Sequence, residues 1–490
     1  DVSFFPDRGS SVALHRQLAA HLRDAILTGE FAGGTRLHAS RTMAEQLGVS
    51  RNTVTQAIDQ LVAEGYLETR LGAGTYVAAG LPLRARGERD AVAAQPAHVS
   101  ARVRRLLPAP AYADPDDGSE PMLFRPGIPD PALFPEGAWR RVAHRWLDAP
   151  ATRMYGDPCG FRPLREAIAA HLRQTRGVTL GADNVVIVEG TRAAMALISD
   201  ILIDPGDAVA VEDPGYGAVR DAVAAAGGVI VPVPLDEEGF DVARAPRTAR
   251  FAYVTPSHQY PTGVVMGLRR RLDLLAWARA AQAYLVEDDY DAEFRYDGAP
   301  LPALQGLDDA RVLYVGTFSK TLAPGLRVAW IVVPDALLDA VRAARTVTSA
   351  GPSFPLQATL AALVGEGHFA LHVRRASARY RERRDALVAA LRARLGDELR
   401  LEGAATGLHL TARFDGDDAA LTAAAETRGV IAPALSRYAA APGGPSGLVL
   451  GFANGEPPAI ARAVERLAEA YDAVRHLPAR ADRLSTQAPR

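Results

Sequence analysis

The chain contains a single lysine, Lys320, at the end of the segment Gly316-Thr317-Phe318-Ser319-Lys320. Every other residue in the Lys+Arg count is arginine, so this protein uses a guanidinium wherever positive charge alone is needed. A primary amine can lose its proton and attack a carbonyl carbon to form a Schiff base, which a guanidinium cannot do near neutral pH. One lysine could also survive by chance in an arginine-biased composition. The residues around Lys320 must therefore distinguish a reactive amine from a chance occurrence.

Other reactive side chains follow apolar runs of the kind that form buried strands. They come after residues 208–211, 251–254, 284–286 and 312–315, and they comprise Tyr216, His258, Tyr260, Asp288, Tyr290, Thr317, Ser319, Lys320 and Arg327. Helical stretches separate several of the runs, which favours a largely parallel sheet covered by helices. Functional side chains in such a sheet lie just beyond the carboxyl ends of its strands. We therefore expect these residues to converge on one edge.

The segment Gly190-Thr191-Arg192 lies between an apolar strand, 185–188, and an apolar helix. The free N–H groups and the positive dipole at the start of a helix form a natural phosphate cradle. The signal is weak alone, because many strand-to-helix turns share it. Together with an amine, a carboxylate, tyrosines and an arginine, it completes the set of groups that pyridoxal 5′-phosphate (PLP) needs. We therefore predict a PLP site in which Lys320 forms the Schiff base.

Composition excludes several classes of protein. The 490 residues carry a net charge of −2, so any binding of nucleic acid must be local. The one cysteine, Cys159, rules out an internal disulfide framework and fits a reducing compartment. It lies in a Gly-Pro-rich segment and is expected to be a turn residue. No apolar run is long enough to span a bilayer and no signal peptide is evident, so we expect a cytoplasmic protein without membrane contact.

The chain divides into zones by composition and periodicity. Residues 1–78 contain short helical patterns, residues 79–121 are rich in Ala, Pro, Gly and Arg, and residues 122–478 alternate strands with helices. We expect an α+β DNA-binding domain, a flexible linker, a large α/β domain with a small C-terminal α+β subdomain, and a tail at 479–490.

The first zone has the pattern of a winged helix-turn-helix. A helix around residues 14–26 is followed by a helix at 41–47, which we expect Ser40 to cap, and by a helix from 51 to about 64, which we expect Ser50 to cap. A strand, a glycine turn and a second strand follow, to about residue 77. Arg41, Ser50, Arg51, Asn52 and Thr53 stand where a reader of double-stranded DNA needs polar side chains.

The alternative for this zone is a small dimerisation module, since residues 1–80 hold 7 arginines and 8 acidic residues. However, Ser40-Arg41-Thr42-Met43-Ala44 and Val49-Ser50-Arg51-Asn52-Thr53-Val54 resemble the winged helix-turn-helix of the GntR family. The resemblance places Arg41, Arg51, Asn52, Thr53 and the wing-tip Gly72 at the DNA.

The region 122–475 resembles a fold-type I, class I aminotransferase, and the whole chain resembles the MocR/GabR subfamily of GntR regulators. The resemblance implies that Asp288 pairs with the pyridine nitrogen, Tyr290 with the phenolate, and that Tyr216 stacks on the ring. The phosphate would be held by Arg327, Thr317, Ser319, Gly190, Thr191 and Arg192. Tyr155 would reach the phosphate of a partner subunit, so the resemblance implies a homodimer.

Two positions depart from the aminotransferase pattern. Tyr260 replaces the usual Asn before Pro-Thr-Gly, so the phenolate contact would fall to His258 or to Tyr260 itself. Val449 stands where an arginine usually grips the substrate α-carboxylate, and losing that clamp should weaken transamination. Arg437, Arg345 and Arg125 are candidate replacements, although each is expected to be a surface residue.

We therefore predict a PLP-dependent transcriptional regulator that senses a small amine, an amino acid or PLP itself. Its operator would have repeated or palindromic half-sites, one for each reader of a dimer. The alternatives are an active aminotransferase with an accessory N-terminal module, and a DNA-binding protein that has lost PLP.

Overall fold

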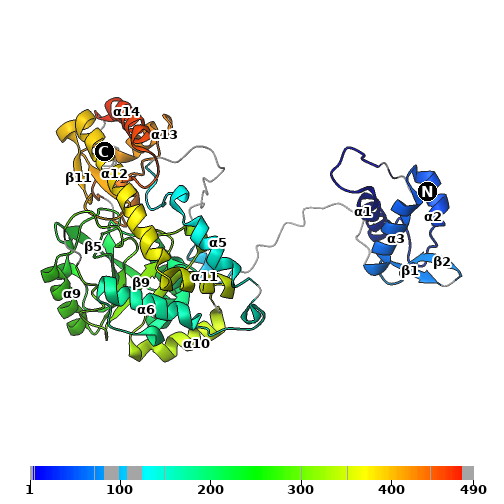
Figure 1. Cartoon of the computed structure of the whole chain (residues 1–490), viewed down its shortest axis with the longest axis horizontal. Coiled ribbons are helices and arrows are strands. Elements are labelled where there is room, and N and C mark those ends of the chain that lie inside the picture. The colour runs from blue at the N-terminus through cyan, green and yellow to red at the C-terminus, as the bar shows by residue number, and fades with distance from the viewer. Residues whose placement is uncertain are drawn as a thin grey trace, which may run out of the picture. The chain divides into compact units, whose positions relative to one another are not determined.

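The computed structural model of this chain describes Phe4 and residues 6–70, 72–81, 99–106, 124–147, 149–298, 301–349, 351–441 and 443–476. The chain forms two compact units that meet in sequence near residue 98 (Figure 1), and each is considered by itself. Most of the predicted linker, including 82–98 and 107–121, and the predicted tail at 479–490 lie outside the described residues.

The N-terminal unit has the predicted order of elements: α1 (Leu14–Leu27), α2 (Ser40–Leu47), α3 (Arg51–Ala63), β1 (Leu67–Arg70) and β2 (Gly74–Val77). The two strands pair antiparallel, from Leu67 opposite Val77 to Arg70 opposite Gly74, and form the wing. Apolar side chains from all three helices and both strands share one core, which includes Leu22, Leu47 and Val54.

One of the two predicted caps is wrong. The Ser50 side chain accepts the Thr53 N–H at 3.1 Å and caps α3 as predicted. Ser40, in contrast, is the first helical residue of α2, and the N-cap position falls on Ala39, which makes no side-chain cap. A serine caps a helix only from the non-helical position, because only there can its oxygen reach the free N–H groups of the first turn.

The large unit is built around an eight-stranded sheet. Its strands run in the order β3 (Val185–Val188), β10 (Ala329–Val332), β9 (Val312–Thr317), β8 (Tyr284–Asp288), β7 (Ala249–Val254), β4 (Ala208–Asp213), β5 (Val229–Asp236) and β6 (Gly239–Phe240). The pairs from β9 to β5 are parallel, whereas β10 is antiparallel to both neighbours and β6 to β5, so the sheet is mixed.

Helices cover both faces of the sheet, as its continuous apolar strands predict. One face packs against α7 (Thr191–Leu202), α8 (Gly217–Ala226) and α10 (Leu338–Thr348). The other packs against α5 (Glu136–His144), α6 (Arg162–Arg176), α9 (Leu268–Ala281), α11 (Phe354–Gly365) and the start of α12 (His368–Leu395). Several of these helices are labelled around the sheet in Figure 1.

The end of the chain forms the smaller subdomain that the sequence predicts. A three-stranded antiparallel sheet, β11 (Arg400–Glu402), β12 (His409–Arg413) and β13 (Gly447–Gly451), packs with α12, α13 (Asp418–Glu426) and α14 (Pro457–Val474) around a separate core. Phe124 and Phe294 join this core from earlier in the chain and tie the subdomain to the large sheet.

The predicted linker contains one described helix, α4 (Ala101–Arg104), within the large unit. Its N-cap is Ser100, and its arginines contact α7 and α8. Among the helices that the structure describes, none is long and apolar enough to cross a membrane.

Ser50→Ala should lower the free energy of unfolding of the N-terminal unit by about 1 kcal/mol, because α3 would lose its cap. Ser40→Ala is the matched control, and its effect should stay within about 0.5 kcal/mol. Native-state hydrogen exchange of the α3 amides in the full chain measures both changes. Equal effects of the two substitutions would contradict the assignment of the cap.

Candidate cofactor site

Lys320 lies just beyond β9, at the edge of the sheet where the sequence places it. Its Nζ donates a hydrogen bond to the Gly127 carbonyl at 2.7 Å. Gly127 has a φ of 75°, and a Cβ there would lie 2.6 Å from Nζ, so only glycine lets this loop approach the amine. Burial lowers the pKa of Lys320, and the charges of Asp291 and Asp288 oppose this shift. Burial thus makes the neutral, nucleophilic amine easier to form than in a solvent-exposed lysine.

Asp288 occupies the end of β8 and is buried. Its Oδ2 accepts the Tyr253 hydroxyl at 2.6 Å, while Oδ1 is buried and has no hydrogen-bond partner in the described residues. Burial raises the pKa of Asp288 to about 7, and the Tyr253 hydrogen bond opposes this shift. A buried carboxylate with one unused oxygen fits a protonated ring nitrogen, which would satisfy that oxygen and lower the pKa again.

The two acidic neighbours of Asp288 point to the other side of the sheet. Glu287 accepts the backbone N–H groups of Leu304 and Gln305, and Asp289 accepts Arg176 Nε at 2.6 Å. The Tyr314 hydroxyl also donates to Asp289, at 2.7 Å. This division follows from the alternation of side chains along a strand. Asp289 is therefore buried and directed away from Asp288's side of the sheet.

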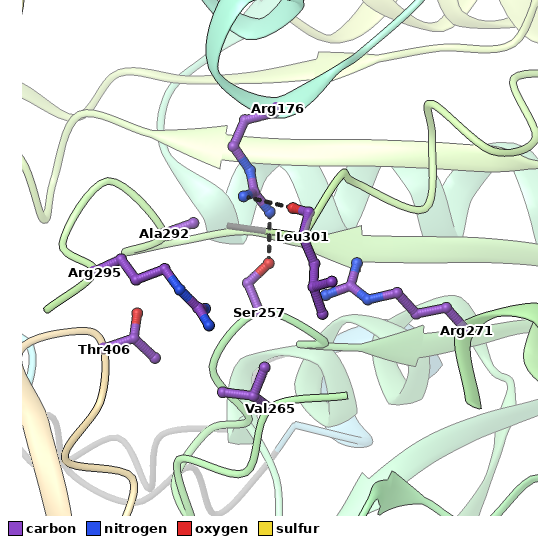
Figure 2. Close-up of a pocket in the computed structure, with 8 residues that line it drawn as sticks. All are labelled: Arg176, Ser257, Val265, Arg271, Ala292, Arg295, Leu301 and Thr406. Atoms are coloured by element: carbon purple, nitrogen blue, oxygen red, sulfur yellow. Dashed lines mark hydrogen bonds between the residues drawn. The ribbon is translucent and has the colours of Figure 1, made fainter. Parts of the chain in front are cut away.

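Figure 2 shows the region around Arg176 on that other side. The Arg176 guanidinium donates to the Ser257 hydroxyl at 2.6 Å and to the Leu301 carbonyl at 3.1 Å, beside a cavity of about 10 Å³. A neighbouring cavity of about 860 Å³ is also lined by Arg176, together with residues of α6 and α12. Neither cavity is lined by Lys320 or Asp288, so both are separate from the candidate site.

The predicted phosphate turn and Arg327 lie together. Gly190 has a φ of 97° and precedes α7, and a Cβ there would lie 3.1 Å from the Arg327 guanidinium. That guanidinium donates to the Glu189 carbonyl at 3.2 Å. Arg327 precedes β10, and because β10 is antiparallel to β9, its start lies at the edge where β9 ends. A cation, a helix N-terminus and a glycine thus form a cradle for an anion.

Other predicted phosphate residues differ in how they are engaged. The Thr317 hydroxyl donates to the Val328 carbonyl at 3.3 Å and accepts the Ser319 N–H at 3.1 Å. Arg192 is directed toward Asp221 of α8, at 3.5 Å, with both side chains largely exposed. Thr191 is the first residue of α7.

Aromatic side chains line the space near Asp288. Tyr260 makes edge-to-face contacts with Tyr216, Tyr290 and Tyr438, with ring centroids 5.9, 5.8 and 5.3 Å away. The Tyr260 hydroxyl donates to that of Tyr438 at 3.3 Å. Burial raises the pKa values of Tyr216 and Tyr260, so both phenols stay neutral. The structure therefore brings together the three predicted tyrosines Tyr216, Tyr260 and Tyr290.

His258 is in contact with Tyr290. The Tyr290 hydroxyl donates to the His258 carbonyl at 2.9 Å and lies 3.2 Å from Nδ1, which is itself 3.1 Å from an Asp291 oxygen. The His258 ring also lies beside that of His409, with centroids 4.6 Å apart. His258 thus contacts the Tyr290 hydroxyl and is itself held by Asp291.

His258, Asp291 and His409 are the one group in the described residues with metal-ligand spacing, their ligand atoms lying within 4.8 Å of one another. However, Asp291 already binds His258 and accepts the Leu408 N–H at 3.2 Å. Burial and His258 lower the pKa of His409, so it stays neutral. These contacts join the cluster to Tyr290, while His258 Nε2 and His409 Nδ1 are buried without a hydrogen-bond partner in the described residues.

The three arginines considered as carboxylate clamps have different surroundings. Arg345 is buried, not a surface residue as expected, and donates to the Pro158 and Ile187 carbonyls. Arg437 is exposed and adjoins Tyr438. The charge of Arg125 helps to lower the pKa of Lys320, so it lies near the amine. Val449 is fully buried in β13, which leaves no polar group at the usual position of the clamp.

The remaining predicted residues lie on surfaces. Tyr155 is fully exposed, with a relative exposure of 102%, and so is free to contact another chain. In the N-terminal unit Arg51, Asn52 and Gly72 are exposed, and Gly72 has a φ of 72° at the wing tip. Ser50 and Thr53 bond each other at 2.8 Å as part of the cap. Arg41 pairs loosely with Glu45, at 3.4 Å.

Sequence reasoning missed several residues of the site. Tyr253 and Gly127 contact Asp288 and Lys320 directly. Glu212 is the second-to-last residue of β4. It accepts the Thr255 hydroxyl at 2.6 Å and Gln259 Nε2 at 3.1 Å, which holds the loop that carries His258 and Tyr260. Burial raises the pKa of Glu212 to about 7. The one available signal was a tyrosine at 253 within the otherwise apolar run 251–254, since a buried hydroxyl needs a partner.

Comparison with known proteins agrees with both halves of this architecture. Residues 130–467 match the family described as aminotransferase class I and II, and residues 14–77 match the bacterial regulatory proteins of the gntR family. Among solved structures, an archaeal alanine:glyoxylate aminotransferase superposes with a TM-score of 0.71 and 26% identity, covering 76% of this chain and 98% of that one. The large unit therefore has the fold of PLP-dependent aminotransferases, joined to a winged helix-turn-helix.

Two regulators match nearly the whole chain. The probable rhizopine catabolism regulatory protein MocR of Rhizobium meliloti is 40% identical over 99% of both chains. The pyridoxine biosynthesis regulator PdxR of Corynebacterium glutamicum is 32% identical over 89% of this chain and 91% of its own. The chain belongs to the MocR subfamily of GntR-type transcriptional regulators, as the sequence motifs predict.

Asp288→Asn should reduce the pH dependence of stability of the PLP-free protein. Burial raises the pKa of Asp288 to about 7, whereas that of an unfolded aspartate is about 3.9. Between these values the folded chain holds a proton that the unfolded chain has released, so Asp288 destabilises the fold increasingly as pH rises to about 7.

Urea unfolding at about pH 5 and about pH 8 should therefore show a smaller loss of stability in the variant, by an amount on the order of 1–3 kcal/mol. Asp339→Asn, at an exposed position of α10, is the control and should behave like the wild type. A variant whose stability falls as steeply as that of the wild type would refute the raised pKa.

Proposed function

We propose that this protein is a DNA-binding regulator whose large unit holds PLP through a Schiff base to Lys320 and senses a small amine, an amino acid or PLP itself. The single observation that carries the proposal is the unused, buried Oδ1 of Asp288 on the same sheet edge as the only lysine. PLP supplies an aldehyde for the Lys320 amine and a ring nitrogen for Asp288.

The other residues are assigned by their positions around that pair. Tyr290, supported by His258 and Asp291, would bond the ring phenolate, and Tyr216 would lie against the ring face. Gly190, Thr191 and Arg327 would hold the phosphate, with Thr317, Ser319 and Arg192 at its margin. The cradle formed by Gly190 and Arg327 supports this assignment, because it offers a cation and free N–H groups at one point.

The effector class follows from the missing clamp. A carboxylate would meet the buried, apolar Val449 where aminotransferases usually offer an arginine. Burying an unpaired carboxylate is costly, so the site favours a small primary amine, or an amino acid whose carboxylate reaches Arg125 or Arg437.

Dimerisation is also part of the proposal. Leu147, Met154 and Tyr155 are large apolar side chains with relative exposures of 62%, 77% and 102%, close together in the sequence. Such a stretch on the surface of a soluble unit marks a contact with another protein. A second copy of this chain would cover it and bring Tyr155 to the phosphate of the other subunit.

An active aminotransferase is the second candidate, and the intact cofactor residues favour it. A turnover assay with several amino donors and 2-oxoacids separates the two. Multiple turnovers at about 1 s⁻¹ or faster would favour the enzyme, whereas a spectral change without product release would favour the sensor.

Lys320→Ala should abolish the covalent attachment of PLP while the protein stays folded, because the phosphate and ring contacts remain. Borohydride reduction followed by mass spectrometry should add the cofactor mass to the peptide that contains Lys320 in the wild type, and not in the variant. A wild-type protein that gains no such mass, and has no imine absorbance, would overturn the proposal for PLP.

Arg51→Ala should weaken DNA binding by about tenfold and reduce the slope of affinity against salt, because Arg51 is an exposed cation at the start of α3. Arg16→Ala is the control, since Arg16 is an exposed arginine on α1 rather than at the start of α3. The measurement is a gel-shift titration at several salt concentrations. If both variants bind as the wild type does, Arg51 does not contact DNA.

A further inference from the structure

The two helices that begin at the candidate cofactor site lie side by side. α7 starts directly after Gly190, and α8 starts directly after Tyr216. They share apolar contacts through residues such as Ile198 and Val223. With 12 and 10 residues, they extend about 18 Å and about 15 Å away from the site.

The far ends of both helices are held by α4 and its C-cap residue, Arg105. Arg105 Nε donates to the Ala224 carbonyl at 2.9 Å, and Nη2 donates to the Ala225 carbonyl at 3.1 Å, both in the last turn of α8. Arg102 Nη1 lies 3.2 Å from Asp200, in the last turn of α7. A cation at a helix C-terminus is favourable, because it faces the negative end of the helix dipole.

These contacts come from one face of a short helix. Arg102 and Arg105 are three residues apart, which places them on the same side of α4. The Arg102 and Asp200 side chains are 52% and 31% exposed, and such a partly exposed ion pair contributes little to stability. The Arg102–Asp200 pair is thus weak enough to open, while the two hydrogen bonds of Arg105 define the geometry of the contact.

The position of α4 in the chain gives this contact a role. It follows the wing strand β2 in the sequence and is the first described helix of the large unit, just after the boundary near residue 98. We propose that α4 is a latch: it couples the occupancy of the cofactor site to the DNA reader through the far ends of α7 and α8. This inference rests on the function proposed above.

The physical step is a small displacement of packed helices. A ligand that binds the start of α7 through its phosphate, and Tyr216 at the start of α8, favours one relative position of the two helices. Because a helix moves as a rigid element, Asp200 and the carbonyls of Ala224 and Ala225 move with it. The α4 contacts then form in one state and break in the other, which is the differential interaction that a ligand-driven switch requires.

The test uses the full chain with PLP as the ligand and a DNA fragment selected from a random pool by the PLP-loaded wild type. In Arg105→Ala, the factor by which PLP changes DNA affinity should be at least about fivefold smaller than in the wild type. The variant should keep the PLP absorbance of the wild type. Arg104→Ala is the matched control, because Arg104 lies on α4, is exposed, and makes no side-chain hydrogen bond or ion pair among the described residues. It should keep the full change.

A second measurement follows the latch itself. Hydrogen exchange of residues 101–106 should differ between the PLP-free and PLP-loaded wild type, and should not differ in Arg105→Ala. Arg102→Asp alone should reduce the PLP-dependent change in DNA affinity. Combining it with Asp200→Arg, which exchanges the two charges, should restore that change. The latch is overturned if exchange in 101–106 is the same with and without PLP, or if Arg105→Ala keeps the full PLP-dependent change. A wild type without PLP absorbance would instead sink the proposed function.

Discussion

The alternation of side chains along β8 is the constraint on which the candidate site depends. Glu287, Asp288 and Asp289 are consecutive and buried, so they cannot all face the same space. Asp288 faces the site with Tyr253, while Arg176 neutralises Asp289 and backbone N–H groups satisfy Glu287 on the other side. Burying three carboxylates would be prohibitive without these partners. The contacts on the other side of the sheet therefore allow Asp288 to be buried at the sheet edge with one carboxylate oxygen unpaired.

Close approach of backbone to side chains shapes the same edge. Gly127 lies against Lys320, Gly190 against Arg327, and a Cβ at Gly407 would lie within 2.4 Å of Asp291 and closer still to His258. The antiparallel β10 brings Arg327 to the edge from the opposite direction along the chain. Because the sheet is mixed, residues that follow parallel strands, such as Lys320, meet a residue that precedes an antiparallel strand, Arg327.

The sequence predicted those parts of the fold and site whose signals are local. The strands, the helix-turn-helix, the wing and the family follow from period, turn chemistry and short motifs, and the turn at Gly190 was visible as a pattern. Tyr253 and Gly127 were not, because their partners Asp288 and Lys320 are distant in sequence and meet only in three dimensions. Ser40 and Ser50 precede or begin similar helices, and a one-residue difference in the helix start decides which of them caps. Arg345 was expected at the surface, yet its three hydrogen bonds to backbone and carboxylate acceptors stabilise it in the interior.

The replacement of lysine by arginine everywhere except position 320 has a chemical consequence. The α-amino terminus apart, every reagent, metabolite or inhibitor that needs a side-chain amine has a single destination in this molecule. A carbonyl compound from the cell meets no competing ε-amine on this chain. The mass of the intact protein is therefore enough to assign a side-chain imine to Lys320. The chain thus offers carbonyl compounds one side-chain amine, so the stoichiometry of such an adduct reports the state of Lys320.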